Sequence, residues 1–227
     1  MFAHTSLRLL AVLAIATVGG MPAASLARGP GTNCPDSATL GGSPMQVLSF
    51  TQLAPGTTQL TPATSAATNT DLDGMAGVGV NKTVAWSTTS GTIAARLRHR
   101  VFDSATSAEV CSCTYQVEVL APSANGTAVC AIVVSNFIYP KTAPLYGAYR
   151  TDGSPKGQVK STTVARAAGK GRTIRFALEN CVVPGQLSKP VTLVFAANQI
   201  LKDGKVYLED QDGELSPAIK VYNPYVP

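Results

Sequence analysis

Hydrophobic and polar residues alternate with a period of two over much of the chain beyond residue 78. In the segment 93–101 one set of alternate positions is mostly apolar, and the other set includes three arginines. In the segment 111–119, cysteine, tyrosine and valine likewise alternate with polar residues. Successive side chains of a β-strand point to opposite faces, so both segments are predicted to be half-buried strands. Their predicted inward faces are Ile93, Ala95, Leu97, His99 and Val101, and Cys111, Cys113, Tyr115, Val117 and Val119.

Further strands are separated by turn residues. The segment 128–139 is apolar on both faces, which predicts a central strand. The segments 162–166 and 173–178 flank Gly169-Lys170-Gly171, which predicts a hairpin. Additional strands are predicted at 191–195, 199–201, 206–208 and 219–222, with turns at Asn125-Gly126, Asp203-Gly204 and Asp212-Gly213. No segment has the sustained 3.6-residue period of a long helix, so residues 71–227 are predicted to form an all-β antiparallel β-sandwich or Greek-key domain.

The N-terminal region has the pattern of an export signal. An apolar run at residues 9–18 is followed by Gly19, Gly20 and Pro22, and small residues precede a cleavage site after Ala27. Residues 1–27 are therefore predicted to be a signal peptide, and the protein to be exported to a periplasmic or extracellular location. The run is too short and interrupted to favour the alternative of a membrane anchor, and no integral membrane segment is expected after cleavage. Residues 28–70 are a low-charge, Thr/Pro-rich segment with a possible short strand at 46–53.

Five cysteines follow the predicted cleavage site, and export to an oxidising compartment makes them disulfide candidates. They are Cys34, Cys111, Cys113, Cys130 and Cys181. Because the number is odd, at least one thiol is free or pairs between chains. Two residues apart on a strand, Cys111 and Cys113 are poorly placed to bond to each other and are expected to reach different partners. The connectivity stays open.

Positive charge is concentrated in the middle of the chain. The sequence has 18 Lys and Arg against 13 Asp and Glu, a net charge of +5, and only 14% of its residues are charged. The arginines at 96, 98 and 100 lie on one strand face, and residues 141–175 hold eight cations and one acid. This pattern predicts a surface for an anionic polysaccharide or lipopolysaccharide, although a solvated face that keeps the protein soluble is the plainer alternative. The candidate residues are Arg96, Arg98, Arg100, Lys156, Lys160, Arg166, Lys170, Arg172 and Arg175.

Motifs for catalysis or cofactor binding are not found. There is no nucleophile elbow and no glycine-rich phosphate loop, so no nucleotide cofactor is expected. His99, the one histidine after residue 27, lies on an inward strand face and is predicted to be a packed core residue. The acidic cluster of Asp203, Glu209, Asp210, Asp212 and Glu214 is attributed to turn chemistry, and no metal or other cofactor is predicted.

The sequence therefore favours an exported, non-catalytic β-sandwich protein with a binding or structural role. An extracellular hydrolase or lyase that uses carboxylates or a metal is the first alternative, and it requires Asp210, Asp212 and Glu214 to converge in a cleft. The second alternative is a subunit of a surface assembly. In that case the odd cysteine could cross-link subunits, and the strand at 219–222 could be exchanged between copies.

Overall fold

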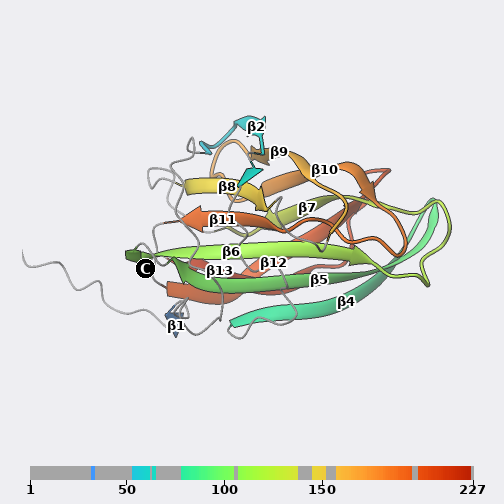
Figure 1. Ribbon diagram of the computed structural model, residues 1–227, viewed down its shortest axis with the longest axis horizontal. Helices are drawn as coiled ribbons and strands as arrows, with labels where there is room; N and C mark the ends of the chain where they lie inside the picture. The colour runs from blue at the N-terminus through green and yellow to red at the C-terminus, as the bar shows by residue number, and fades with distance from the viewer. Residues whose placement is uncertain are drawn as a thin grey trace, which may run out of the picture. The chain divides into compact units, whose positions relative to one another are not determined.

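The computed structural model describes residues 32–33, 53–61, 63–64, 78–104, 107–137, 145–151, 157–195 and 199–225. The predicted signal peptide and most of the predicted strand at 46–53 lie outside these ranges. Throughout the described residues the chain is all-β and forms two packed sheets, which confirms the predicted β-sandwich class. Figure 1 shows the strands of sheet B, from β8 to β4, side by side in one layer that packs on sheet A.

Strand order defines the two sheets. Neighbouring strands are antiparallel, apart from the short parallel pair β3–β8. Sheet A has the order β1 (Thr32–Asn33), β12 (Gln199–Asp210), β7 (Val129–Ser135), β10 (Ile174–Val182), β9 (Ser161–Arg166) and β2 (Thr58–Leu60), and β13 (Ile219–Tyr225) also pairs with β12. Sheet B has the order β3 (Ala63–Thr64), β8 (Leu145–Thr151), β11 (Val191–Phe195), β6 (Ser107–Val119), β5 (Gly91–Ser104) and β4 (Val78–Thr88).

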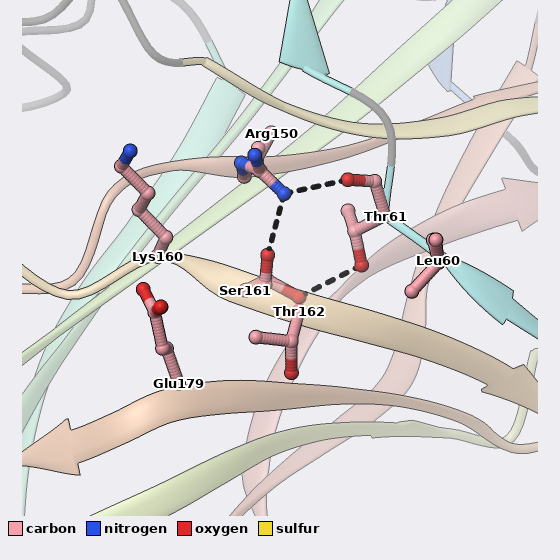
Figure 2. A pocket seen from close by; sticks show the side chains of 7 residues that line it. All are labelled: Leu60, Thr61, Arg150, Lys160, Ser161, Thr162 and Glu179. Carbon is pink, nitrogen blue, oxygen red and sulfur yellow. Dashed lines mark hydrogen bonds between the residues drawn. The ribbon is translucent and has the colours of Figure 1, made fainter.

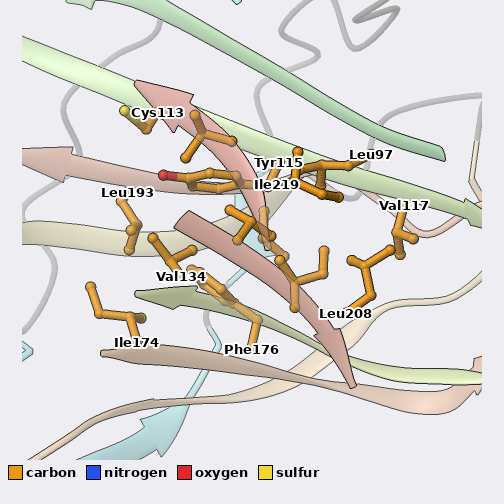
Figure 3. Packing of buried hydrophobic residues seen from close by; sticks show 14 of the residues in the cluster. Leu97, Cys113, Tyr115, Val117, Val134, Ile174, Phe176, Leu193, Leu208 and Ile219 are labelled. Atoms are coloured by element: carbon orange, nitrogen blue, oxygen red, sulfur yellow. The ribbon is translucent and has the colours of Figure 1, made fainter. Parts of the chain in front are cut away.

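The hydrophobic core fills the space between the sheets. From sheet B, alternate residues of β5 and β6 point inward, and the predicted inward residues of β5 are all fully buried. From sheet A, Ile174, Phe176 and Leu208 meet them, as Figure 3 shows. Each large apolar side chain buried in this way contributes about 1.5–3 kcal/mol. The two-residue period read from the sequence therefore identified the inner face of these strands correctly.

Two of the predicted turns differ from the structure. Asn125-Gly126 was expected to join two strands in a hairpin, but the strands on either side belong to different sheets, because β6 lies in sheet B and β7 in sheet A. Asp203-Gly204 was expected to separate two strands, but β12 runs through it and only the register against β13 shifts there. Gly204 is needed at this shift because a Cβ would collide with the Asn223 side chain, which donates to the Asn136 carbonyl at 3.1 Å.

The other predicted turns are confirmed. β9 and β10 form an antiparallel hairpin around Gly169 and Gly171, whose φ angles of 68° and 60° suit glycine. β12 and β13 form a hairpin that closes at Asp212-Gly213.

β7 lies between β10 and β12, the central position that its two apolar faces predict. The N-terminal segment also supplies strands, because β1 and β2 join sheet A and β3 joins sheet B.

One disulfide joins two neighbouring strands of sheet A. Cys130 on β7 bonds to Cys181 on β10, where the register between these strands shifts. Cys113 is free and buried, so the expectation that Cys111 and Cys113 both reach partners does not hold for Cys113. Cys34 and the side chain of Cys111 lie outside the described part. A disulfide indicates an oxidising compartment.

No helix within the described ranges has the length and apolarity that a membrane span requires.

Candidate functional site

The arginines of β5 lie on the outer face of sheet B, because they alternate with its buried core residues. Arg98 donates to the Glu118 carboxylate at 2.7 Å, and Arg96 contacts the same oxygen at 3.3 Å. The side chain of Arg98 is only 10% exposed. One carboxylate on β6 is thus shared by two of the three guanidinium groups, and the Arg98 group is largely removed from solvent.

Arg100 is held against the backbone. Its Nη1 donates to the His99 carbonyl at 2.8 Å and approaches the Val80 carbonyl at 3.4 Å. The side chain lies over Gly79, where a Cβ would collide with the His99 carbonyl oxygen and come within 2.7 Å of Arg100 Cδ. Glycine at position 79 therefore gives the arginine room to cross β4, and the guanidinium supports the edge of sheet B.

The other predicted cations are distributed over sheet A and its loops. Arg166 is buried and donates to the Gly171 and Leu53 carbonyls at 3.0 and 3.1 Å. Arg175 forms two hydrogen bonds to Glu209, at 2.8 and 2.6 Å, which raise the pKa of Arg175. Lys170 and Arg172 are exposed in the β9–β10 connection, and Lys160 is exposed just before β9. Lys156 lies outside the described residues.

The structure therefore does not gather the nine predicted residues on one surface. The β5 arginines belong to sheet B, whereas Arg166 and Arg175 belong to sheet A. Arg166 supports the β9–β10 connection, and Arg175 pairs with Glu209 across β7. The role of these residues in binding an anion stays a prediction.

A second group of cations was not singled out from the sequence. Lys205 on β12 and Lys220 on β13 are direct cross-strand partners, and both are exposed. Lys202 is exposed on the same hairpin, and its Nζ lies 5.4 Å from the centroid of the Tyr222 ring. We call Lys202, Lys205 and Lys220 the lysine hairpin. Within the described ranges, no carboxylate lies at ion-pair distance from any of the three ammonium groups.

The sequence did contain a signal for the lysine hairpin. Lys205 precedes Val206, and Lys220 precedes Val221, so each lysine alternates with a buried apolar residue. The two lysines are also equally far from the Asp212-Gly213 turn. A hairpin that closes at this turn places them opposite each other, whereas the density of cations along the chain does not group them.

His99 lies in the core, as the sequence predicted. It is fully buried, stacks on Tyr115 with ring centroids 4.8 Å apart, and its Nδ1 lies 3.1 Å from the Thr114 carbonyl. Burial is the main cause that lowers the pKa of His99 to about 4. Burial also raises the pKa of the neighbouring Cys113 thiol. A neutral imidazole and a protonated thiol that solvent does not reach are poor candidates for base and nucleophile.

The acidic residues Asp210, at the end of β12, and Asp212, just after it, act in turns. Asp210 is buried, and its Oδ1 accepts the backbone N–H groups of Asp212 and Glu214 at 2.9 and 2.7 Å. Asp212 Oδ2 accepts the hydroxyls of Thr89 and Ser90 at 2.8 and 2.9 Å. These bonds close the β12–β13 turn and join it to the β4–β5 turn. No three ligand-type side chains of the described part come together in a way that could hold a metal ion.

A pocket of about 570 Å³ lies where the β8 side of sheet B meets β9 and β10 of sheet A. Arg150 reaches across from β8, and its Nη1 donates to the Thr61 carbonyl at 2.7 Å and to the Ser161 carbonyl at 3.0 Å. The hydroxyls of Thr61 and Ser161 are 3.0 Å apart and share a hydrogen bond. Figure 2 shows these bonds and the other lining residues, which are Leu60, Lys160, Thr162 and Glu179.

Comparison with protein-family models, with curated proteins and with solved structures gave no match to this chain.

Proposed function

We propose that this protein is an exported, non-catalytic binding protein for an anionic polysaccharide, and that the lysine hairpin is its main contact surface. One observation carries the proposal: Lys205 and Lys220 lie directly opposite each other, exposed and without a carboxylate partner in the described part of the chain. Like charges directly opposite on a sheet are destabilising. A residue pair that lowers stability, with no neighbouring group that offsets the loss, is a candidate for a functional role.

The contrast with the arginines supports this choice of surface. Arg175 is already paired with Glu209, and Arg96 and Arg98 share Glu118, so an external anion would compete with an internal carboxylate. The three lysines have no such competitor among the described residues. Their ammonium groups can approach a succession of carboxylate or sulfate groups along an extended chain, because they are spread over two adjacent strands.

Aromatic side chains on the same hairpin suit a sugar ligand. The half-buried Tyr222 packs beside Lys202, and Tyr207 lies two residues beyond Lys205 on β12 and is half-buried. Such a side chain combines an apolar ring with a hydroxyl, which suits a ligand that has both C–H faces and hydroxyl groups. The oxidising compartment indicated by the Cys130–Cys181 disulfide is one in which acidic polysaccharides occur.

The test is retention on immobilised heparin and polygalacturonate, with neutral dextran as the blank. The variant Lys202→Ala/Lys205→Ala/Lys220→Ala is expected to bind about three- to hundred-fold more weakly at low salt, because three exposed ionic contacts contribute roughly 0.2–1 kcal/mol each. Added salt is expected to reduce the retention of the wild type, because exposed charges are screened.

A second triple variant, Lys82→Ala/Lys170→Ala/Arg172→Ala, removes the same charge from exposed positions elsewhere. We expect it to bind within about two-fold of the wild type. Equal losses in both variants would mean that net charge alone governs retention, and a loss only in the second would return the assignment to the cations around the β9–β10 connection. Either result, or wild-type retention no stronger than on dextran, contradicts the proposal.

A further inference from the structure

The floor of the pocket near β9 is fixed by hydrogen bonds between three separate parts of the chain. Arg150 Nη1 holds the carbonyls of Thr61 and Ser161, and the hydroxyls of these two residues bond to each other. Thr61 also donates its backbone N–H to the Thr162 carbonyl at 2.8 Å. The carbonyl and hydroxyl groups of Thr61 and Ser161 in the floor are thus hydrogen-bonded within the protein, and their positions do not depend on a ligand.

The rim of the pocket carries opposite charges that do not neutralise each other. Lys160 and Glu179 are both exposed, and no ion pair joins them, although the Glu179 N–H donates to the Lys160 carbonyl at 2.8 Å. Figure 2 shows their polar ends on the same side of the Arg150 guanidinium. The pocket is therefore lined by a cationic group and by a carboxylate that accepts hydrogen bonds, and Thr162 contributes a hydroxyl to the same lining.

An apolar surface completes the pocket. Leu60 on the short edge strand β2 is 78% exposed, the most exposed of the large hydrophobic side chains in the described part. The volume of about 570 Å³ lies inside the range of roughly 300–1,000 Å³ that is usual for small-molecule sites. The ligand that these groups fit combines a carboxylate, several hydroxyls and a C–H face.

From these features we propose that the pocket binds a uronic acid, with its carboxylate at Lys160 and two of its ring hydroxyls donating to Glu179. The Thr162 hydroxyl contacts a further ring oxygen, and the sugar's C–H face packs on Leu60. A carboxylate side chain is an acceptor only and has two oxygens, so it suits two neighbouring hydroxyl donors. The inference rests on the proposed function for its ligand class but uses different residues.

The charge arrangement favours a uronic acid over other small anions. A phosphate ester carries more negative charge, which would face Glu179 at the rim. A small zwitterionic amino acid such as alanine could place its ammonium at Glu179, but it has no hydroxyl for Thr162 and only one methyl group to pack on Leu60. The same uronic acid chemistry is found in a free sugar acid and at the end of an acidic polysaccharide, so both forms belong in the test.

The experiment is isothermal titration of the intact chain with sodium glucuronate, trigalacturonate, glucose and alanine. Glucuronate is expected to bind at least about ten-fold more tightly than glucose, since a charge-assisted contact is lost without the carboxylate. The variants Lys160→Ala and Glu179→Gln are each expected to weaken glucuronate binding about ten-fold. Lys170→Ala, an exposed lysine in the next connection along the chain, is the matched control and is expected to bind as the wild type does.

Tighter binding of trigalacturonate than of glucuronate identifies a chain end as the ligand, and equal binding identifies a free sugar acid; both support the pocket. Absence of glucuronate binding, unchanged binding in both pocket variants, or a preference for alanine would overturn it. The lysine-hairpin triple variant is expected to keep its glucuronate binding. The pocket can therefore fail while polymer retention persists, and polymer retention can fail while the pocket still binds glucuronate.

Discussion

At the scale of single residues, the core contains polar groups that the apolar pattern alone does not explain. His99 and Tyr115 are cross-strand partners on β5 and β6, and both are fully buried. Cys113, two residues before Tyr115, approaches the Tyr222 carbonyl of β13 at 3.7 Å. These side chains lie on the inner face of sheet B, and Figure 3 shows Cys113 and Tyr115 among apolar neighbours. These side chains are held by packing and by contacts with backbone carbonyls. Because burial changes the pKa of His99, the stability of the protein depends on pH.

The lowered pKa of His99 predicts a loss of stability in acid. The folded-state pKa is about 4, whereas an unfolded histidine has a pKa near 6.5. Between these values the unfolded chain binds a proton that the folded chain does not, so the free energy of unfolding falls as the pH drops from 6.5 to 4. The full difference of about 2.5 pKa units corresponds to about 3 kcal/mol.

Urea unfolding of the wild type and of His99→Phe between pH 4 and 8 measures this contribution. Phenylalanine keeps an aromatic ring against Tyr115 but does not titrate. The unfolding free energy of the variant should therefore change by about 3 kcal/mol less than that of the wild type over this pH range. The carboxylates titrate in both proteins and cancel in the comparison. Parallel pH profiles for the two proteins would contradict the prediction.

At the scale of elements, the β12–β13 hairpin combines a fold-determining turn with an unfavourable charge pair. Asp212-Gly213 closes the turn, and Val206 and Val221 fix the register by entering the core. This register places Lys205 opposite Lys220. A lysine on an edge strand also discourages pairing with another sheet, so Lys220 on β13 serves solubility as well as binding.

Replacing one lysine of the pair is expected to raise stability. Lys220→Thr removes the like-charge repulsion and introduces a β-branched residue on an exposed strand position, which should increase the free energy of unfolding by about 0.2–1 kcal/mol. Lys82→Thr is the matched control, because Lys82 is exposed on β4 and its partner is the apolar Leu97. Chemical denaturation of the three proteins checks this. A gain in Lys82→Thr as large as that in Lys220→Thr would show that strand propensity, not repulsion, is responsible.

At the scale of the whole sandwich, polar contacts join the two sheets beyond the apolar core. Arg150 crosses from β8 of sheet B to the Ser161 carbonyl of β9 in sheet A. The β4–β5 turn of sheet B contacts the β12–β13 turn of sheet A through Asp212. Because these contacts join residues far apart in the sequence, they form only when the sheets are correctly packed.

The turn-to-turn contact is expected to restrain the β4–β5 hairpin locally. Asp212→Ala removes the acceptor for Thr89 and Ser90 and should lower stability by about 0.5–1.5 kcal/mol. Amide hydrogen exchange in the β4–β5 turn should become faster, while the central strand β7 keeps its protection relative to global unfolding. Asp212→Asn retains an acceptor oxygen and should lie between the wild type and Asp212→Ala. Unchanged exchange in the turn would mean that the contact has no restraining effect.

Much of the local structure could be predicted from the sequence. The alternation in 93–101 identified which residues of β5 enter the core, and the glycines at 169 and 171 identified a hairpin. Both signals are local, because they depend on the two-residue period of a strand and on backbone angles that glycine adopts easily. His99 was correctly placed in the core by the same alternation.

The pairing of distant segments was decided only by the tertiary structure. Asn125-Gly126 connects strands of different sheets, and Asp203-Gly204 lies within one long strand, because core burial and competition for hydrogen-bond partners outweigh the turn preference of two residues. In the same way, Arg175 pairs with Glu209 and Arg150 reaches Thr61 only after strands far apart in the sequence become neighbours. The sequence by itself determined the β class, several of the longer strands, the inner face of β5 and the excess of positive charge, whereas β8 and the short strands β1, β2 and β3 were not predicted. Which cations are paired, which stay exposed and where the pocket lies were set by the packing of the two sheets, since contacts between remote residues leave no periodic signal along the chain.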